Sequence, residues 1–350
     1  MAAVSGQALS PTDTDTMLRT VEIIGGGLAG LSLGLGLRAR GIPVRLIESG
    51  SYPRHRVCGE FITGLDEQTS SRLQLRELLK PARPARSVTW CEPGRPDMRH
   101  HFPHPALCLS RFNLDAKMAE AFTASGGDLR TQQRCTAEPA EGRVIACGRR
   151  PLASSPWIGL KQHFRSLPLH DDLEVHLGRG AYVGLTRVED SLVNVCGLLP
   201  RPRAGESCSL TGRIRAVGLN DLADRLQAAE SIEGTDCAVA GLNYASKATV
   251  PASLGDQQGL IPPFTGHGMT IALQSASASL GHFEAWSRGL VPWTGTIAGV
   301  SRDLHRRFRR RILVSRLIHP WLLDPGRRSL IHALHRMGLL PFNTLYRLSH

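Results

Sequence analysis

The start of the chain alternates short apolar runs with a glycine-rich loop. Residues 21–24 form a predicted buried strand that runs directly into glycine. A helix with an apolar face begins at Leu28, and Gly41 ends it. A second apolar run, residues 44–47, ends in Glu48. The pattern predicts a strand, a loop, a helix and a second strand, which together make a βαβ unit.

The loop of this unit has the glycine spacing of a dinucleotide-binding site. Gly25 permits a tight turn, Gly27 lets backbone amides approach a pyrophosphate, and Gly30 lets the helix pack closely on the strand. The free amides and the positive dipole end of the helix would hold the diphosphate. Glu48 follows the loop by about 20 residues, the spacing of an acid that binds ribose hydroxyls. The motif by itself does not separate NAD from FAD.

A second glycine-rich segment, residues 255–268, extends the prediction to FAD. We expect Asp256 in a loop after a strand through residues 249–250, where it can accept a hydrogen bond from a ribityl hydroxyl. Gly266 and Gly268 are expected to leave room for a flat ring on the backbone. The helix that follows would direct its first amides at the N1–C2=O edge of an isoalloxazine. Two loops suited to opposite ends of one ligand therefore predict FAD, and a surface loop with a helix cap is the alternative.

The middle of the chain changes to strand-like alternation. In residues 157–164 the side chains of Lys161 and His163 lie on one face, and most of the apolar side chains lie on the other. Further strands are predicted over residues 173–177, 182–185 and 192–198, and a helix over residues 213–226. The pattern predicts an antiparallel sheet between the two glycine-rich segments.

Two further segments resemble known flavoproteins. Residues 52–61, Tyr-Pro-Arg-His-Arg-Val-Cys-Gly-Glu-Phe, are similar to the segment after the ribose-binding acid in FAD-dependent oxidoreductases of the geranylgeranyl reductase and aromatic hydroxylase superfamily. Residues 110–115, Ser-Arg-Phe-Asn-Leu-Asp, look like the Arg-x-x-Leu-Asp element of that superfamily. The resemblance covers residues 20–290 and is sharpest for geranylgeranyl-reductase-like proteins.

The resemblance implies an α/β fold. It consists of a Rossmann-like FAD-binding domain of the glutathione reductase and p-hydroxybenzoate hydroxylase type, an inserted antiparallel β-sheet substrate domain that covers the flavin, and a C-terminal helical tail. We expect a disordered start over residues 1–18, an FAD-binding domain over residues 19–82, 105–152 and 235–297, a substrate domain over residues 83–104 and 153–234, and a basic helical region over residues 298–350. The helix at residues 213–226 is expected near the pocket. The motifs and the resemblance together imply cofactor contacts at Gly25, Gly27, Ala29, Gly30, Glu48, Cys58, Gly59, Arg111, Asp256, Gly266, Gly268 and Met269.

The chain also departs from the superfamily. Many relatives carry an Ala-Asp-Gly segment near the middle, but residues 144–150 contain no aspartate here. This difference weakens the case for a monooxygenase at which NAD(P)H docks transiently. The Trp-x-Trp-x-Ile-Pro pattern of flavin halogenases is absent, which disfavours halogenation.

No catalytic residue follows firmly from the sequence, and four side chains are weak candidates. His267 lies in the predicted flavin loop, where a helix cap is the alternative role. Cys58 falls near the expected flavin, and a buried inert thiol is favoured over a redox thiol. Lys161 and His163 lie on the predicted roof of the flavin site, although such residues most often face solvent. The eight cysteines include no Cys-x-x-Cys pair, so no metal site is predicted.

Positive charge is concentrated at the end of the chain. The net charge is +12, and residues 301–350 hold 11 arginines against two aspartates, a net +9. The arginines alternate with leucine and tryptophan, which suits an anionic membrane surface, an acidic carrier protein or an electron-donor protein. Helices packed on the body, with the arginines in water, are an equal alternative, and no motif supports nucleic-acid binding.

The rest of the composition indicates a cellular location. No apolar run approaches the length of a membrane span, and the first 20 residues contain no apolar segment of a secretion signal. Scattered cysteines fit a reduced cytosol. We therefore expect a cytoplasmic protein, with peripheral binding to the inner membrane face as the alternative.

Three functions remain open at this point. The leading one is an FAD-dependent oxidoreductase that reduces C=C bonds of an isoprenoid, lipid-like or polyketide substrate by hydride transfer from flavin N5, and the other two are alternatives to it. The second is an FAD monooxygenase that takes electrons from NAD(P)H and hydroxylates an aromatic or polyketide substrate. The third is an electron-carrier flavoprotein that docks a partner through the basic tail. Resemblance does not choose among them, because one scaffold hosts many reactions.

Overall fold

Two β-sheets organise the computed structural model, which describes residues 17–148, 153–242, 251–257, 266–340, 342, 344 and 346. The first sheet is parallel, with the strand order β6-β2-β1-β7. Its strands are β1 Val21–Ile24, β2 Val44–Ile47, β6 Asp128–Arg130 and β7 Arg143–Ile145. Ile145 also forms a parallel bridge with Ser253, so the chain just before the second glycine-rich segment lies at the β7 edge. The predicted strands at residues 21–24 and 44–47 are confirmed, whereas residues 249–250 lie outside the described residues.

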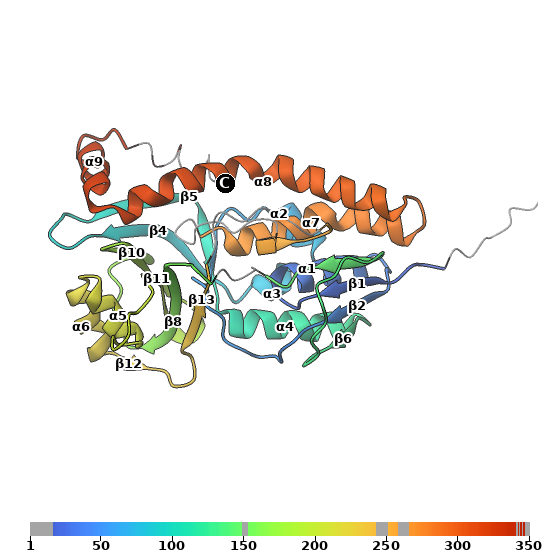
Figure 1. The fold of residues 1–350 in the computed structure, drawn as a ribbon, viewed down its shortest axis with the longest axis horizontal. Helices are drawn as coiled ribbons and strands as arrows, with labels where there is room; N and C mark the ends of the chain where they lie inside the picture. The colour runs from blue at the N-terminus through green and yellow to red at the C-terminus, as the bar shows by residue number, and fades with distance from the viewer. Residues whose placement is uncertain are drawn as a thin grey trace, which may run out of the picture.

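Helices α1 Leu28–Arg38, α4 Arg111–Ala124 and α7 Gly268–Ser287 form the body around this sheet (Figure 1). Residues 28–37 of α1 are all buried, because α1 contacts both α4 and α7. Two glycines permit these close contacts. A Cβ on Gly34 would lie 2.8 Å from the ring of Phe122 in α4, and a Cβ on Gly36 would lie 2.7 Å from Leu280 in α7. The predicted helix after the first loop and the predicted helix after the second loop are therefore packed against each other.

The second sheet has nine strands, in the order β12-β8-β11-β10-β9-β4-β5-β3, with β13 also paired to β8. The strands are β3 Phe61–Ile62, β4 Arg83–Cys91, β5 Met98–Cys108, β8 Trp157–Arg165, β9 Leu173–Gly178, β10 Ala181–Arg187, β11 Val193–Pro200, β12 Glu230–Ser231 and β13 Cys237–Ala240. All pairs are antiparallel except β4 with β9, which run parallel. The sheet expected to be antiparallel is therefore mixed, because β4 and β9 come from distant parts of the chain and no hairpin joins them.

Helices α5 Leu210–Ala216 and α6 Asn220–Ala228 cover one face of this second sheet. The prediction of one helix over residues 213–226 is wrong in detail, because the chain turns at Gly218 with φ +87°. Its expected place near the pocket stays a prediction. Both helices share a core with the apolar side of β8, whereas Lys161 and His163 point to its opposite face.

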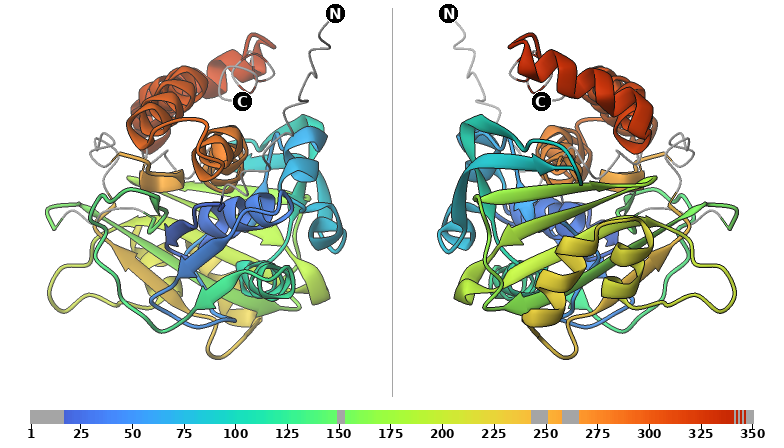
Figure 2. Two further views of the ribbon diagram at one scale, coloured as in Figure 1. Left: turned by 90° about the vertical axis from the view of Figure 1, so that its right-hand side faces the viewer. Right: turned by 90° about the vertical axis from the view of Figure 1, so that its left-hand side faces the viewer.

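The remaining helices are α2 Glu67–Arg72, α3 Arg76–Leu79, α8 Trp293–Leu323 and α9 Pro325–Arg336. Helix α8 packs along α7 and runs along one edge of the molecule, and α9 follows it at the far end (Figures 1 and 2). In the described part of the chain, no helix combines the length and the apolar character that crossing a membrane requires. All eight cysteines are free thiols. The predicted α/β class, with a parallel sheet, a second sheet and a helical C-terminal region, is confirmed.

Candidate functional site

The first glycine loop forms the tight connection that its sequence predicts. Gly25 has φ +108°, and a Cβ on Gly30 would collide with the carbonyl oxygen of Gly25. These two positions therefore require glycine for the turn itself. Gly27 differs, because its backbone is extended and, outside its chain neighbours, no atom of the described residues lies within 4 Å of the place where a Cβ would stand. Gly27 also precedes α1 without giving it a side-chain cap, so the first amides of α1 face open space beside Gly27.

Glu48 lies beside this loop at the carboxyl end of β2. Its side chain is buried, and its Oε2 accepts a hydrogen bond from the Gly26 amide at 2.8 Å. Its Oε1 accepts from the Gly50 amide at 2.8 Å and from Arg54 at 2.7 Å. Burial raises the pKa of Glu48, but the Gly50 hydrogen bond and the charges of Arg54 and Arg56 outweigh burial and hold the pKa below its ordinary value. The acid predicted from spacing is thus an ionised carboxylate next to the glycine loop.

The second glycine segment meets the first. Residues 255–257 form a short turn that includes Asp256, and Gly255 has φ +60°. A Cβ on Gly255 would lie 3.3 Å from the Cβ of Ala29 and 3.7 Å from the Cβ of Ala272, so the turn sits between the first turns of α1 and α7. The structure therefore brings the two signatures together, although more than two hundred residues separate them. Residues 258–265 of the segment lie outside the described residues.

The start of α7 offers a second uncapped helix terminus. His267 is the N-cap residue, its side chain makes no capping hydrogen bond, and it is buried. In the described part of the chain, nothing beyond its own helix and neighbours lies within 4 Å of a Cβ placed on Gly268, and Met269 is buried. The expectation of room at Gly266 is wrong, because a Cβ there would collide with the ring of Phe61.

Phe61 also fills the space beside Gly59, where a Cβ would lie 2.8 Å from its ring. The aromatic ring therefore ties residues 59–61 to the second glycine segment. Of Gly59, Gly266 and Gly268, it is Gly268 at which the described residues leave the open backbone that a flat ring would need.

A chain of charges connects Glu48 to the start of α4. Arg111 donates two hydrogen bonds of 2.7 Å to Asp115. Arg56 donates to Asp115 at 3.0 Å, and its other nitrogen lies 3.6 Å from Glu48. Cys58 lies in the same region, and burial raises the pKa of its thiol. The thiol is therefore protonated at neutral pH, which fits the interpretation of Cys58 as an inert group rather than a nucleophile.

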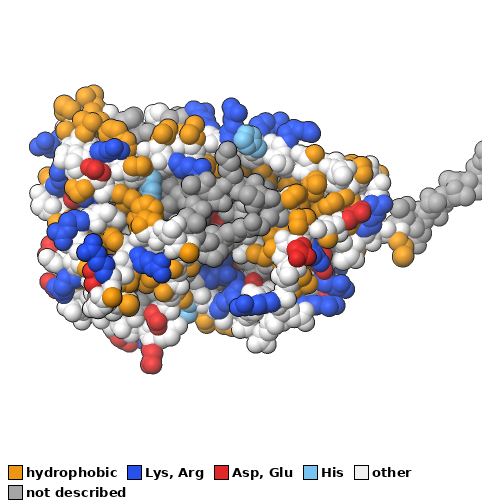
Figure 3. All heavy atoms as spheres, viewed as in Figure 1, with side chains coloured by type: hydrophobic (Ala, Val, Ile, Leu, Met, Phe, Trp, Pro, Cys, Tyr) orange, Lys and Arg blue, Asp and Glu red, His pale blue; other side chains and the backbone are white. Residues whose placement is uncertain are grey.

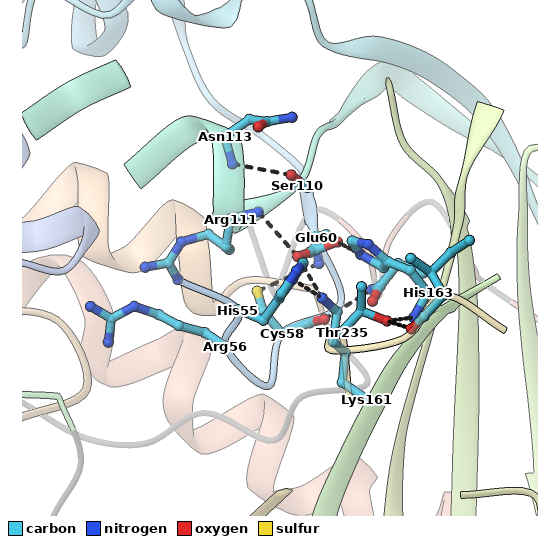
Figure 4. Close-up of polar contacts among 12 residues, drawn as sticks. His55, Arg56, Cys58, Glu60, Ser110, Arg111, Asn113, Lys161, His163 and Thr235 are labelled. Carbon is cyan, nitrogen blue, oxygen red and sulfur yellow. Dashed lines mark hydrogen bonds and ion pairs between the residues drawn. The ribbon is translucent and has the colours of Figure 1, made fainter. Parts of the chain in front are cut away.

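Glu60 is the centre of a buried polar cluster between β8 of the second sheet and the start of α4 (Figure 4). Its Oε2 lies 2.7 Å from Nε2 of His163, and its Oε1 lies 3.4 Å from Nζ of Lys161. The Arg111 amide at the start of α4 donates to Oε1 at 3.1 Å, so the helix dipole also favours this carboxylate. Nζ of Lys161 lies 2.9 Å from Nδ1 of His55. We call Glu60, His163, Lys161 and His55 the Glu60 cluster.

The burial of the charged Glu60 cluster and the backbone conformation of Glu60 both cost folding free energy. The side chains of Glu60 and Lys161 are 0% exposed, and that of His163 is 3% exposed. Glu60 also has φ +59°, a left-handed conformation that non-glycine residues rarely adopt. Strained backbone and buried charge persist where function or the surrounding structure requires them. The expectation that Lys161 and His163 face solvent is therefore wrong.

His55 is the partly exposed end of the cluster, and its ring stacks on Phe112 at a centroid distance of 4.4 Å. Burial lowers the pKa of His55 to about 4, and the positive charge of Lys161 acts in the same direction. We predict that the ring proton shifts of His55 titrate with a midpoint near pH 4 in an NMR experiment. Lys161→Met should raise this midpoint, because it removes the neighbouring charge. A midpoint near 6.5 in the unchanged protein would contradict this environment.

The sequence analysis missed Glu60 as a site residue. Its signal was present, since an acidic residue stands between the glycine and the phenylalanine of a segment that resembles cofactor-binding chains. Its side-chain partners His163 and Lys161 lie more than 100 positions further along the chain, so spacing could not reveal them. Within the described residues, no group of three or more His, Cys, Asp or Glu side chains could hold a metal ion.

Comparison with known proteins shows the fold. No protein-family model matches the chain, and no curated protein matches its sequence. Among solved structures, the flavoprotein/dehydrogenase from Cytophaga hutchinsonii has a TM-score of 0.73 at 14% identity, covering 94% of this chain and 91% of that chain. The flavin-dependent brominase Bmp2 has a TM-score of 0.71 at 16% identity, covering 91% of this chain and 93% of that chain.

A third similar structure is PqsL of Pseudomonas aeruginosa in complex with 2-aminobenzoylacetate. It has a TM-score of 0.69 at 17% identity, covering 90% of this chain and 100% of that chain. PqsL is described as a probable FAD-dependent monooxygenase. The chain therefore shares the fold of these flavin proteins over nearly its whole length.

Proposed function

We propose that the chain binds FAD and acts as an FAD-dependent monooxygenase on a small aromatic or polyketide substrate, with NAD(P)H as electron donor. One observation carries the cofactor assignment: the N-termini of α1 and α7 lie on either side of the Gly255 turn without a capping side chain from Gly27 or His267, and among the described residues each has open space at a glycine, Gly27 or Gly268. Such termini bind anionic or electron-rich groups. Glu48 adds a carboxylate at the place where a ribose follows the diphosphate.

In this proposal each part of the site has a separate task. Gly27, Ala29 and Gly30 hold the diphosphate at the start of α1, and Glu48 holds the adenosine ribose. Asp256 and the first amides of α7, at Gly268 and Met269, hold the ribityl chain and the ring. Bound FAD would supply the redox chemistry, accepting hydride and reacting with oxygen.

The Glu60 cluster supplies the proton chemistry in this proposal. It lies between β8 and the start of α4 (Figure 4), and the ring of Phe61, next to Glu60 in the sequence, contacts Gly266 of the second glycine segment. His55 links the buried carboxylate, through Lys161, to the partly exposed side. We assign Glu60 and His163 to holding or accepting a substrate proton, and Lys161 and His55 to positioning that carboxylate.

The proposal includes the domain arrangement expected from the sequence. Residues 19–82, 105–152 and 235–297 form the FAD-binding domain, residues 83–104 and 153–234 form the substrate domain, and residues 298–350 form the C-terminal region. The placement of β4 in one sheet with β8–β11 supports this arrangement, whereas β3 and β13 of the same sheet belong to segments assigned to the FAD-binding domain.

The choice of a monooxygenase is supported by the fold shared with PqsL, whose structure contains 2-aminobenzoylacetate. The brominase shares the fold as well, but the halogenase tryptophan pattern is absent from the sequence. Reduction of C=C bonds in an isoprenoid or lipid-like substrate is the second candidate. The similarity of residues 52–61 and 110–115 to geranylgeranyl-reductase-like proteins favours it.

The deciding experiment compares electron acceptors. We predict that the FAD-loaded protein oxidises NAD(P)H with matching oxygen uptake, and that phenolic or 2-aminobenzoyl compounds stimulate both rates. A hydroxylated product, identified by mass spectrometry, would complete the test. Protein reduced by light without oxygen and then reoxidised by a polyprenyl alkene, without oxygen-dependent turnover, would support the reductase and contradict the monooxygenase.

A further inference from the structure

We infer that the outer face of α8 and α9 binds an anionic membrane surface. This face, which we call the outer ridge, consists of Arg306, Arg310, Leu313, Leu317 and Trp321 of α8 together with Leu330, Met337 and Leu339 in and after α9. The α8 residues follow one another at intervals of three or four, so they lie on one side of the helix. The inference does not depend on the proposed flavin chemistry.

Exposed apolar side chains are concentrated on this ridge. Leu313 is 59% exposed, Leu317 is 63% exposed and Trp321 is 40% exposed. In the described part of the chain, six of the nine exposed large apolar side chains belong to the ridge. The opposite side of α8 already buries Val300, Leu304 and Phe308 in the body. Packing on the body therefore explains the inner face of α8 and leaves the outer face to another surface.

The charge beside these apolar side chains is positive. Arg306 is 80% exposed, and Arg302, Arg309 and Arg310 are exposed on the same half of α8. Figure 3 shows the basic side chains gathered along the edge formed by α8 and the apolar side chains gathered at the corner formed by α9. The ridge is therefore basic toward the start of α8 and apolar toward α9.

The two aspartates of the region offset only part of this charge, and the region keeps a net +9. Asp303 lies 2.9 Å from His282 and 3.2 Å from Arg306. Asp324 caps α9 by accepting from the Arg327 amide at 2.9 Å. Basic charge beside leucine and tryptophan is the pattern by which helices bind anionic lipid headgroups and insert their apolar side chains at the interface.

The ridge is held in place by buried contacts. Arg328 of α9 lies 3.1 Å from Glu92 and donates to the carbonyl of Gly178 at 3.0 Å. His332, one turn later, lies 2.9 Å from the same Glu92. These contacts fix α9 against β4 and β9, so the ridge does not have to fold on binding. Helices α8 and α9 also stand above the rest of the molecule (Figure 2), and a projecting edge can reach a flat lipid surface more easily than a recessed one.

The test measures binding of the full-length protein to vesicles by flotation. We expect binding to vesicles of phosphatidylcholine with phosphatidylglycerol, little binding to phosphatidylcholine alone, and weakening by salt because the attraction is electrostatic. Arg306→Gln with Arg310→Gln should lower the partition coefficient by about tenfold or more, since each basic residue near the surface contributes. Leu313→Ser with Leu317→Ser should lower it as well, by reducing insertion.

Leu290→Ser is the matched control, because Leu290 is 72% exposed but lies before α8, away from the ridge. It should bind like the unchanged protein, and all these variants should keep the unchanged melting temperature because the replaced side chains are exposed. Three results would overturn the inference: no flotation with either vesicle, equal flotation with both, or ridge variants that bind like the Leu290→Ser control. If the protein does not bind vesicles, the outer ridge is instead a candidate surface for binding a protein partner.

Discussion

Replacing Glu60 by glutamine is expected to lower the free energy of unfolding by about 3–5 kcal/mol. The side chain of Lys161 is 0% exposed, and its charged neighbour in the cluster is Glu60, 3.4 Å away. Burial holds the pKa of His55, the other neighbour, near 4, so at neutral pH that ring accepts from Lys161 without adding a charge of its own. Glu60→Gln therefore leaves a buried ammonium group without its counter-charge. Urea unfolding followed by circular dichroism measures the difference.

A double-mutant cycle separates lost charge pairing from lost packing. Lys161→Met alone leaves Glu60 with His163 and the Arg111 amide, so we expect a smaller loss than for Glu60→Gln. The combined variant removes both charges, and its loss should be less than the sum of the two single losses. Glu77→Gln is the control, since the Glu77–Lys80 pair is 76% and 69% exposed and should contribute at most about 1 kcal/mol. A Glu60→Gln loss as small as that of the control would contradict the buried ion pair.

The sequence correctly predicted those parts of the fold that are determined by residues close to one another in the chain. The apolar run before Gly25, the helix after it and the acid at Glu48 lie within 30 positions, so hydrophobic period and turn chemistry determine them locally. The same reasoning placed Lys161 and His163 on one face of β8. It could not tell whether that face of β8 is exposed to solvent or covered by another part of the chain. The answer depends on where residues 55–61, which are distant in the sequence, lie in the folded protein.

The errors have one physical source, which is contact between distant segments. The ring of Phe61 occupies the space beside Gly266 that the sequence around Gly266 predicted to be open. About two hundred residues separate Phe61 from Gly266 in the sequence. Gly218 divides the predicted helix because α5 and α6 must both lie flat on the sheet. For the C-terminal region, a membrane- or partner-binding surface and helices packed on the body were the two alternatives from the sequence. Helix α8 combines both features, because its inner face packs on the body and its outer face remains exposed.

Gly27→Val is expected to abolish most FAD binding without weakening the protein. Among the residues that the structure describes, none beyond its chain neighbours comes within 4 Å of a Cβ at Gly27, and its extended backbone suits any residue. A valine there would instead occupy the space that the diphosphate needs, so we expect FAD affinity to fall by at least about tenfold, or about 1.4 kcal/mol. Fluorescence titration with FAD measures the affinity, and thermal unfolding of the cofactor-free protein tests that stability is unchanged.

Two further variants, Gly281→Ala and Gly268→Val, test whether the effect of Gly27→Val on FAD binding is specific to its position. Gly281→Ala also adds a side chain where no protein atom lies within 4 Å, but in the exposed middle of α7, so it should keep FAD affinity and raise stability by about 0.4–1 kcal/mol. Gly268→Val should weaken FAD binding while leaving ADP binding intact, whereas Gly27→Val should weaken both. This contrast follows because the two glycine segments are assigned to opposite ends of one ligand. If Gly27→Val binds FAD normally, or if Gly268→Val and Gly27→Val affect ADP equally, the extended FAD assignment is wrong even though the fold is right.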